Sequence, residues 1–174
     1  MATGTILLPI GAAIPPDGST NNAAAAILRV KSSAAAPSLH FLQANFDGTT
    51  KEFLYWSFRM PSDYASSPTL KVQYKMASAT SGNVVIEGRL AAITPTDATN
   101  GDAKALGSAN TTGANAVAGT AGYVKEISLA LTNDDSAAAG DWVTVMLARA
   151  PADANDTASG DMEVIAVSLE YTTA

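Results

Sequence analysis

The sequence contains no cysteine and a single histidine, and only 15% of its residues are charged. Without cysteine the chain cannot form disulfides, Cys-based zinc sites or a thiol nucleophile. The 16 acidic side chains outnumber the 10 Lys and Arg side chains, which gives a net charge of −6, and no basic cluster offsets this balance. An acidic surface of this kind repels phosphate backbones, so we expect no nucleic-acid partner.

Long apolar runs are also missing. No stretch approaches the roughly 20 apolar residues that a membrane-spanning helix needs. The first ten residues (MATGTILLPI) lack the basic start of a signal peptide. We therefore expect a soluble protein that is made in the cytoplasm and has no membrane partner.

What the sequence does contain is a series of short segments in which apolar and polar residues alternate. Residues 70–76 (LKVQYKM) alternate without a fault, which is typical of a half-buried antiparallel strand. Weaker or longer segments of the same kind occupy residues 26–31, 39–46, 53–60, 84–93, 123–131, 141–150 and 162–172.

Alternation also predicts which side chains face the core, since successive residues of a strand point to opposite faces. The expected core residues are Leu54, Trp56, Phe58, Met60, Leu70, Val72, Tyr74, Met76, Ile86, Gly88, Leu90, Ile127, Leu129, Leu131, Val143, Val145, Leu147, Ile165, Val167, Leu169 and Tyr171. In the segment 141–150 this pattern places Trp142, Thr144 and Met146 on the opposite face.

Many short antiparallel strands with no helix between them predict an all-β fold. We expect a two-sheet antiparallel sandwich, jelly-roll-like, with about eight strands and an N-terminal arm. The arm would comprise residues 1–25 and the sandwich residues 26–174. Residues 94–120 are rich in Gly, Ala, Asn and Thr, which predicts one long loop that is either functional or mobile.

The arm contains a short apolar segment, Ile6, Leu7, Leu8, Pro9 and Ile10. Two hypotheses fit it equally well. It could add a strand to the sheet edge of a neighbouring subunit, or it could pair within its own sandwich. Under the first hypothesis Ile6, Leu7, Leu8 and Ile10 are interaction residues.

Candidates for catalysis are few. His40 could serve as a base, but no nucleophile motif accompanies it, and its place in an alternating segment favours a solvated or interfacial side chain. We therefore predict no enzyme, no catalytic residue and no cofactor.

Acidic residues in the C-terminal loops offer one alternative, because loop carboxylates can hold calcium. These residues are Asp134, Asp135, Asp141, Asp153, Asp156 and Asp161. None of them has the spacing of a calcium loop. Turn formation is the commoner role of such residues, and no metal site is predicted.

Aromatic residues could form a sugar-stacking platform. Most of them lie on alternating strands, where core packing explains them. Tyr55 and Tyr64 are the exceptions, and we predict them as interaction residues.

Several ordered motifs carry a resemblance to a known group of proteins. They are residues 53–64 (FLYWSFRMPSDY), 81–93 (SGNVVIEGRLAAI), 127–133 (ISLALTN), 139–143 (AGDWV), 153–157 (DANDT) and 159–161 (SGD). Together, over residues 40–173, they resemble β-sandwich proteins of tailed-bacteriophage particles, including trimeric capsid cement or decoration proteins. These motifs are strands and turns, so the resemblance carries over no catalytic residue.

The resemblance implies a structural virion protein on the capsid surface, synthesised in the host cytoplasm. Its partners would be the major capsid protein and itself, as a homotrimer that stabilises the head. One alternative is a fibre-tip or receptor-binding domain that contacts host glycans. A further alternative is a carbohydrate-active enzyme on a jelly-roll scaffold.

Overall fold

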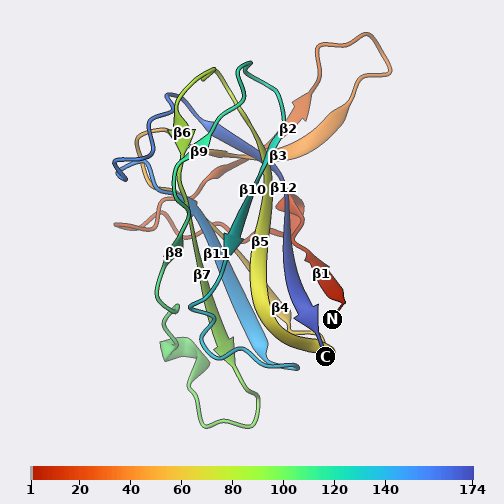
Figure 1. Cartoon of the computed structure of the whole chain (residues 1–174), viewed down its shortest axis with the longest axis vertical. Helices are drawn as coiled ribbons and strands as arrows, with labels where there is room; N and C mark the ends of the chain where they lie inside the picture. The colour runs from red at the N-terminus through yellow and green to blue at the C-terminus, as the bar shows by residue number, and fades with distance from the viewer. Residues whose placement is uncertain (1) are drawn as a thin grey trace.

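The computed structural model describes residues 2–174, which form two packed antiparallel sheets and two single-turn 3-10 helices (Figure 1). Sheet A contains β1 (Thr3–Leu7), β2 (Ala26–Lys31), β3 (His40–Phe46), β5 (Tyr64–Met76), β10 (Lys125–Ala130) and β12 (Met162–Thr173). Sheet B contains β4 (Phe53–Arg59), β7 (Ile86–Ile93), β8 (Asn110–Thr111) and β11 (Trp142–Arg149). The 3-10 helices are η1 (Ile10–Ala12) and η2 (Gly101–Ala103). The predicted all-β, jelly-roll-like sandwich is confirmed.

The order of strands in sheet A is β10-β5-β12-β3-β2, with β1 also paired to β12, and in sheet B it is β4-β11-β7-β8. A separate ladder joins β6 (Asn83–Val84) to β9 (Asn115–Ala116). From β3 onward, successive long strands alternate between the two sheets. The chain therefore wraps around one core instead of completing one sheet before starting the other. None of the helices among residues 2–174 has the length and apolar character to cross a membrane.

The core lies between the sheets and is built from the alternating residues that the sequence predicts. Leu54, Leu70, Val72, Val143 and Leu147 are all fully buried. Gly88 of β7 also points inward, and a Cβ atom there would lie 2.9 Å from side-chain methyls of both Leu129 and Leu131. The two sheets approach so closely at this point that a larger side chain would have to displace these leucines.

β12 departs from regular alternation at Ile165. Met162 and Val164 face the core, but the register against β5 shifts between Val164 and Ala166, and burial resumes at Val167. Such a bulge places two residues of one strand opposite one of its neighbour, which resets the alternation. The prediction that Ile165 faces the core is therefore wrong, because Ile165 lies at the bulge and is only half-buried.

The N-terminal segment belongs to the sandwich. β1 pairs with β12 in register from Thr3↔Thr172 to Leu7↔Ser168. Further along, the backbone of Ile14 exchanges two hydrogen bonds with Tyr55 at the edge of β4. Of the two hypotheses for the apolar segment, the structure shows pairing within its own sheet.

Residues 94–120 are more ordered than the expected single loop. They contain η2, β8 and β9, and β8 extends sheet B through the pair Gly88↔Asn110. The buried Asn110 side chain holds this segment in place, since its Oδ1 accepts hydrogen bonds from the Thr132 hydroxyl and the Asn133 backbone N–H, both at 3.0 Å. Because these contacts are polar, hydrophobic alternation could not reveal them.

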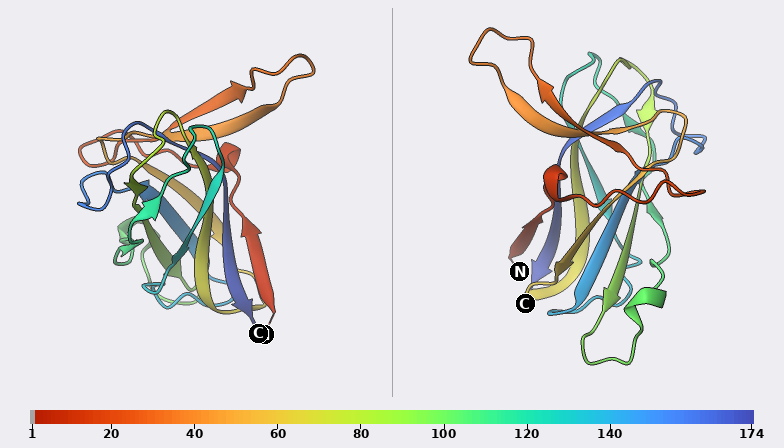
Figure 2. Two further views of the ribbon diagram at one scale, coloured as in Figure 1. Left: turned by 45° about the horizontal axis from the view of Figure 1, so that its top comes forward. Right: turned by 180° about the vertical axis from the view of Figure 1, so that it is seen from behind.

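The β2–β3 hairpin projects from the sandwich (Figure 2). β12 pairs with β3 only at its inner end, from Val164↔Ala44 to Met162↔Phe46. At the point where β3 separates from β12, η1 packs against both strands. A Cβ atom on Gly11 of η1 would lie 3.0 Å from a methyl of Leu42. Residues 32–39 close the outer end of the hairpin.

Candidate binding site

The outer face of sheet B, which points away from the core, carries two aromatic side chains. Trp142 and Thr144 of β11 point outward because the residues between and after them point into the core. On the same face, Met146 has Tyr55 of β4 on one side and Arg89 of β7 on the other. Trp142 remains 48% exposed, which is unusual for a side chain with so much apolar surface.

A small pocket opens between Trp142 and Tyr55. Its volume is about 160 Å³, and its lining residues are Tyr55, Ala91, Ile93, Gly101, Lys104, Leu106, Trp142 and Thr144. Ala91 and Thr144 are paired neighbours with short side chains, which leaves room between the two aromatic residues. Burial raises the pKa of Tyr55, against an opposing effect of Arg89. The phenol therefore stays protonated and can both donate and accept a hydrogen bond.

The third side of the pocket comes from residues 94–107, which we call the strap. Lys104 Nζ of the strap lies 2.8 Å from the carboxylate of Asp135. The same carboxylate accepts a hydrogen bond from the Ala92 backbone N–H at 2.9 Å. The Gly107 N–H donates to the Leu90 carbonyl at 2.9 Å. These contacts fasten the strap to β7 and set the position of the Lys104 ammonium group.

A charged cluster adjoins the pocket on the same face. Glu87 is 6% exposed and lies between Lys51 and Arg89, whose Nε is 2.8 Å from a Glu87 carboxylate oxygen. Burial pushes the pKa of Glu87 upward, but the hydrogen bonds from Lys51 and Arg89 outweigh it and hold the pKa below its usual value. Glu87 is therefore a fixed anion that orients Arg89.

The structure corrects several predicted interaction residues near the N-terminus. Leu8 and Ile10 are buried in the core, at 2% and 4% exposure, and Ile6 packs against it. The Trp56 indole N–H donates to the Pro9 carbonyl at 2.9 Å and fixes this turn. Leu7, on the other face of the strand, is 74% exposed and stays available for contact.

Tyr64 is also not an exposed contact residue. It is 5% exposed, and its ring packs against that of Tyr171 with the centroids 5.5 Å apart. The Tyr171 hydroxyl donates to Asp63 at 2.9 Å. The Pro61–Tyr64 turn carries the chain from sheet B to sheet A, and this crossing brings Tyr64 inward. Tyr55, by contrast, does line the candidate pocket.

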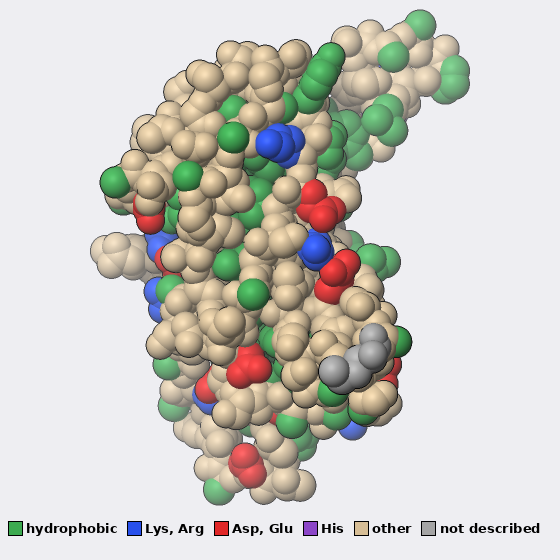
Figure 3. Space-filling model, in the orientation of Figure 1, with side chains coloured by type: hydrophobic (Ala, Val, Ile, Leu, Met, Phe, Trp, Pro, Cys, Tyr) green, Lys and Arg blue, Asp and Glu red, His purple; other side chains and the backbone are tan. Residues whose placement is uncertain are grey.

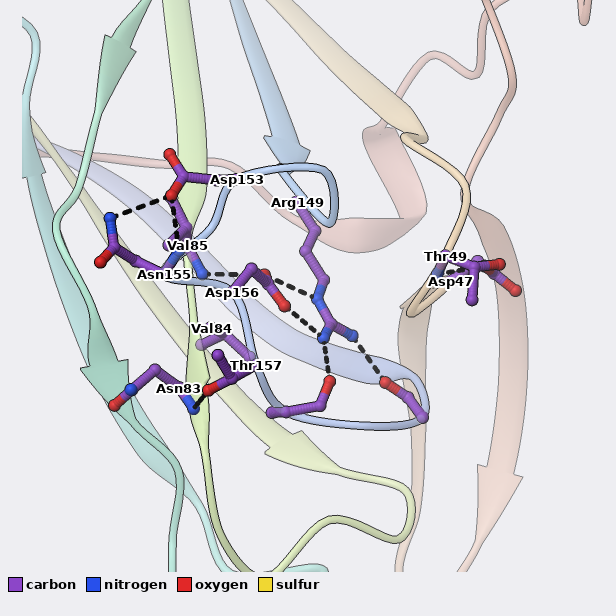
Figure 4. A network of polar contacts seen from close by, with 12 residues as sticks. Asp47, Thr49, Asn83, Val84, Val85, Arg149, Asp153, Asn155, Asp156 and Thr157 are labelled. Atoms are coloured by element: carbon purple, nitrogen blue, oxygen red, sulfur yellow. Dashed lines mark hydrogen bonds and ion pairs between the residues drawn. The ribbon is translucent and has the colours of Figure 1, made fainter.

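The loop carboxylates serve as structural groups. Asp156 forms an ion pair with the fully buried Arg149 and also accepts a hydrogen bond from the Val85 N–H at 2.9 Å (Figure 4). Asp153 caps its own turn by accepting from the Asn155 N–H, and Asp141 accepts from the Ala138 N–H. Within the described part of the chain, no three acidic or histidine side chains gather as a metal site.

The sequence indicates two features of the candidate site only in part or not at all. Alternation predicts that Trp142 faces outward, but the strand aromatics as a group are predicted to pack in the core. Lys104 lies in a segment without hydrophobic alternation, so the sequence does not predict its position beside Trp142. His40 lies at the start of β3 on the projecting hairpin, where it is exposed as expected.

No protein-family model matches the sequence, and no curated protein matches it either. Solved structures with a similar arrangement include several carbohydrate-binding modules and also, over 32% of its length, an isomalto-dextranase of Arthrobacter globiformis. CBM27-1 of Caldicellulosiruptor saccharolyticus, in complex with mannohexaose, has 9% identity and a TM-score of 0.43, with 95% of this chain and 96% of that chain covered. The family 11 module of Clostridium thermocellum, in complex with a β-1,3-1,4-mixed-linked tetrasaccharide, has 10% identity and a TM-score of 0.41, with 96% and 87% covered. Likenesses this distant carry no functional inference.

Proposed function

We propose that this chain is a non-catalytic binding protein that takes carbohydrate on the outer face of sheet B. The observation that carries the proposal is the pocket between Trp142 and Tyr55, on whose rim Trp142 is half exposed. An exposed indole beside a second aromatic side chain at a pocket combines apolar surface with a hydrogen-bond donor, which suits contact with a ligand.

The chemistry of the pocket suits a sugar ring. A pyranose presents an apolar face of C–H groups, which stacks on an aromatic ring, and a rim of hydroxyls, which need hydrogen-bonding partners. Trp142 and Tyr55 supply the aromatic surface, while the Tyr55 hydroxyl, Thr144 and Lys104 supply polar groups within the same pocket. A few placed polar groups on an apolar lining are typical of small-molecule sites.

The charges around the pocket favour binding over hydrolysis. A glycosidase needs two carboxyl groups, one of them an acid with a raised pKa. Glu87 and Asp135, which lie beside the pocket, are instead ion-paired to Arg89 and Lys104, and the pKa of Glu87 is lowered. Glu87 is therefore held as an anion and is not placed to protonate a leaving group.

The test is to screen the purified protein on a glycan array and then measure the affinity for any hit by calorimetry. Trp142→Ala and Tyr55→Ala should each weaken binding tenfold or more, which corresponds to at least about 1.4 kcal/mol. Tyr123→Ala is the matched control, since Tyr123 is an exposed aromatic residue outside sheet B. The proposal would be refuted if the protein binds no glycan, or if the affinity for a bound glycan is unchanged in both variants.

A second candidate function is the structural virion role, with the major capsid protein as partner, that the motif resemblance implies. The projecting β2–β3 hairpin supports it, because Leu28, Leu39 and Leu42 leave apolar surface exposed there. Electron microscopy of an intact particle would test this role by locating the protein. For a cement protein, particles without the chain should also release their genome at a lower temperature, and unchanged thermal stability would count against it.

A further inference from the structure

The β2–β3 hairpin is the part of the molecule that its own fold supports least. From Leu28 to Gln43 the two strands pair only with each other, because β12 leaves β3 after Ala44. An isolated two-stranded ribbon is marginally stable in water. A projecting ribbon therefore benefits from contacts outside the sandwich.

One face of the hairpin is apolar from Leu28 outward, beyond the buried polar side chain of Gln43. The cross-strand pairs Leu28↔Gln43 and Val30↔Phe41 lie on this face, and Leu39 follows where the strands end. Leu28 is 44% exposed and Leu39 is 64% exposed. Contiguous apolar surface on an exposed element indicates an interaction site, whereas single apolar residues would need no explanation.

The apolar surface continues from the hairpin onto the body. Beneath this face lies an open groove of about 690 Å³, lined on the hairpin side by Leu39 and Phe41 and on the body side by Val124 and Ile165. Val124 is 56% exposed, and the bulge in β12 turns Ile165 toward the groove. The groove thus has apolar walls on both sides, one formed by the hairpin and the other by the body.

The hairpin and the rest of the chain carry opposite net charges. Residues 18–46 contain two basic side chains, Arg29 and Lys31, and no acidic one, so the rest of the chain has eight basic against sixteen acidic side chains. Neither Arg29 nor Lys31 forms an ion pair with the residues described here. Figure 3 shows the projecting lobe at upper right without acidic side chains, which lie on the body instead. A basic hairpin is attracted to an acidic body of this kind.

We propose that the β2–β3 hairpin docks on a second copy of this chain, with its apolar face against the groove of the neighbour. Each chain supplies one hairpin and one groove, so in a closed symmetric assembly every hairpin is docked and every groove is occupied. Docking covers Leu28 and Leu39, whereas Arg29 and Lys31 lie on the opposite face of the hairpin and attract the acidic neighbour only at longer range. This surface is separate from the outer face of sheet B and does not depend on carbohydrate binding there.

The first test is the molar mass of the purified chain by light scattering over a concentration series. The wild type should be a closed oligomer, and Leu28→Ser combined with Leu39→Ser should give the monomer. Both residues are exposed, so these changes leave the core intact, and circular dichroism checks this. Ile14→Ser is the matched control, because Ile14 is 51% exposed but lies beside sheet B. A monomeric wild type, or an unchanged mass in the double variant, would overturn the proposal.

A cross-linking test separates docking on a neighbour from folding back on the same chain. The chain has no cysteine, so a single cysteine can be introduced at any chosen position. Ser38→Cys puts one in the hairpin loop, and Val124→Cys puts one in the groove. Mixing the two variants under mild oxidation should give a disulfide-linked heterodimer, faster than mixing Ser38→Cys with Ser57→Cys on the exposed face of sheet B. Equal rates for the two mixtures would mean that the hairpin does not occupy the groove of a neighbour.

Discussion

The Arg149 guanidinium binds both carboxylate oxygens of Asp156, with Nε at 3.0 Å and a terminal nitrogen at 2.7 Å. The same guanidinium donates to the carbonyls of Gly160 and Ala158. Both charged side chains are almost completely buried. The pair holds the loop between β11 and β12 against the end of the sandwich.

Arg149→Met should destabilise the protein strongly. The substitution keeps an unbranched chain of similar size but leaves the buried Asp156 carboxylate without its ion-pair partner, which costs about 3–5 kcal/mol in comparable cases. Urea unfolding measures the loss of free energy of unfolding. Arg29→Met, on the exposed hairpin, is the control and should change stability by no more than about 0.5 kcal/mol. Similar losses in both variants would show that the ion pair has no special role.

Gly88→Ala tests the close approach of the two sheets. The added methyl meets Leu129 and Leu131 at 2.9 Å, and overpacking of this kind costs about 1–3 kcal/mol. Gly113→Ala is a matched control, since a Cβ atom at Gly113 meets nothing within 4 Å and the backbone has no positive φ. Thermal unfolding of the two variants should differ by several degrees, and equal midpoints would contradict the packing described for β7.

Tyr64 should make the stability of the protein fall at high pH. Burial raises the pKa of Tyr64 from 10.0 to about 12, with a smaller contribution from Asp134. The unfolded chain releases this proton above pH 10, whereas the folded chain keeps it to about pH 12. The stabilisation is therefore complete below pH 10 and is lost as the pH rises toward 12, by an amount of the order of 2 kcal/mol.

The measurement is the urea midpoint at a series of pH values for the wild type and for Tyr64→Phe. The variant has no phenolic proton at this position, so its stability should fall less steeply between pH 10 and pH 12. Parallel curves would mean that Tyr64 titrates in the folded protein as it does in the unfolded chain.

Asp135→Asn tests how the strap positions Lys104. An asparagine keeps an acceptor for the Ala92 N–H but loses the ion pair with Lys104. The pair is partly exposed, so the free energy of unfolding should change by less than about 1 kcal/mol. Amide hydrogen exchange should instead become faster in residues 94–107 and stay unchanged in β11. Unchanged exchange in the strap would show that the other backbone contacts hold it alone.

Much of the fold could be predicted because hydrophobic alternation follows burial along regular strands. In β4, β5 and β11 the alternation identified the inward residues, including Leu54, Val72 and Val145. The prediction that Ile165 faces the core is wrong because a bulge adds one residue to the strand, and the hydrophobic pattern does not indicate that bulge. The prediction of Tyr64 failed because turn residues follow no period, and the crossing between sheets decides their burial.

The candidate site was harder to predict, since it depends on which strands become neighbours. Tyr55 and Trp142 are far apart in the sequence and meet only because β4 and β11 pair in sheet B. Lys104 joins them through a segment held by Asp135, whose own position depends on the β10–β11 connection. Alternation predicts the face of the sheet on which each residue lies. Which residues lie beside it depends on the order of the strands, and the sequence does not predict that order.

The place of β12 in sheet A has a consequence for how the protein is made. β12 lies between β5 on one side and β1 and β3 on the other. These three earlier strands therefore lack a pairing partner until the final strand has been made. During synthesis the first 160 or so residues leave the ribosome without the strand that joins them, at roughly 5–20 residues per second. Sheet A can close only after translation passes residue 173, and until then the nascent chain presents unpaired edges for chaperones to cover.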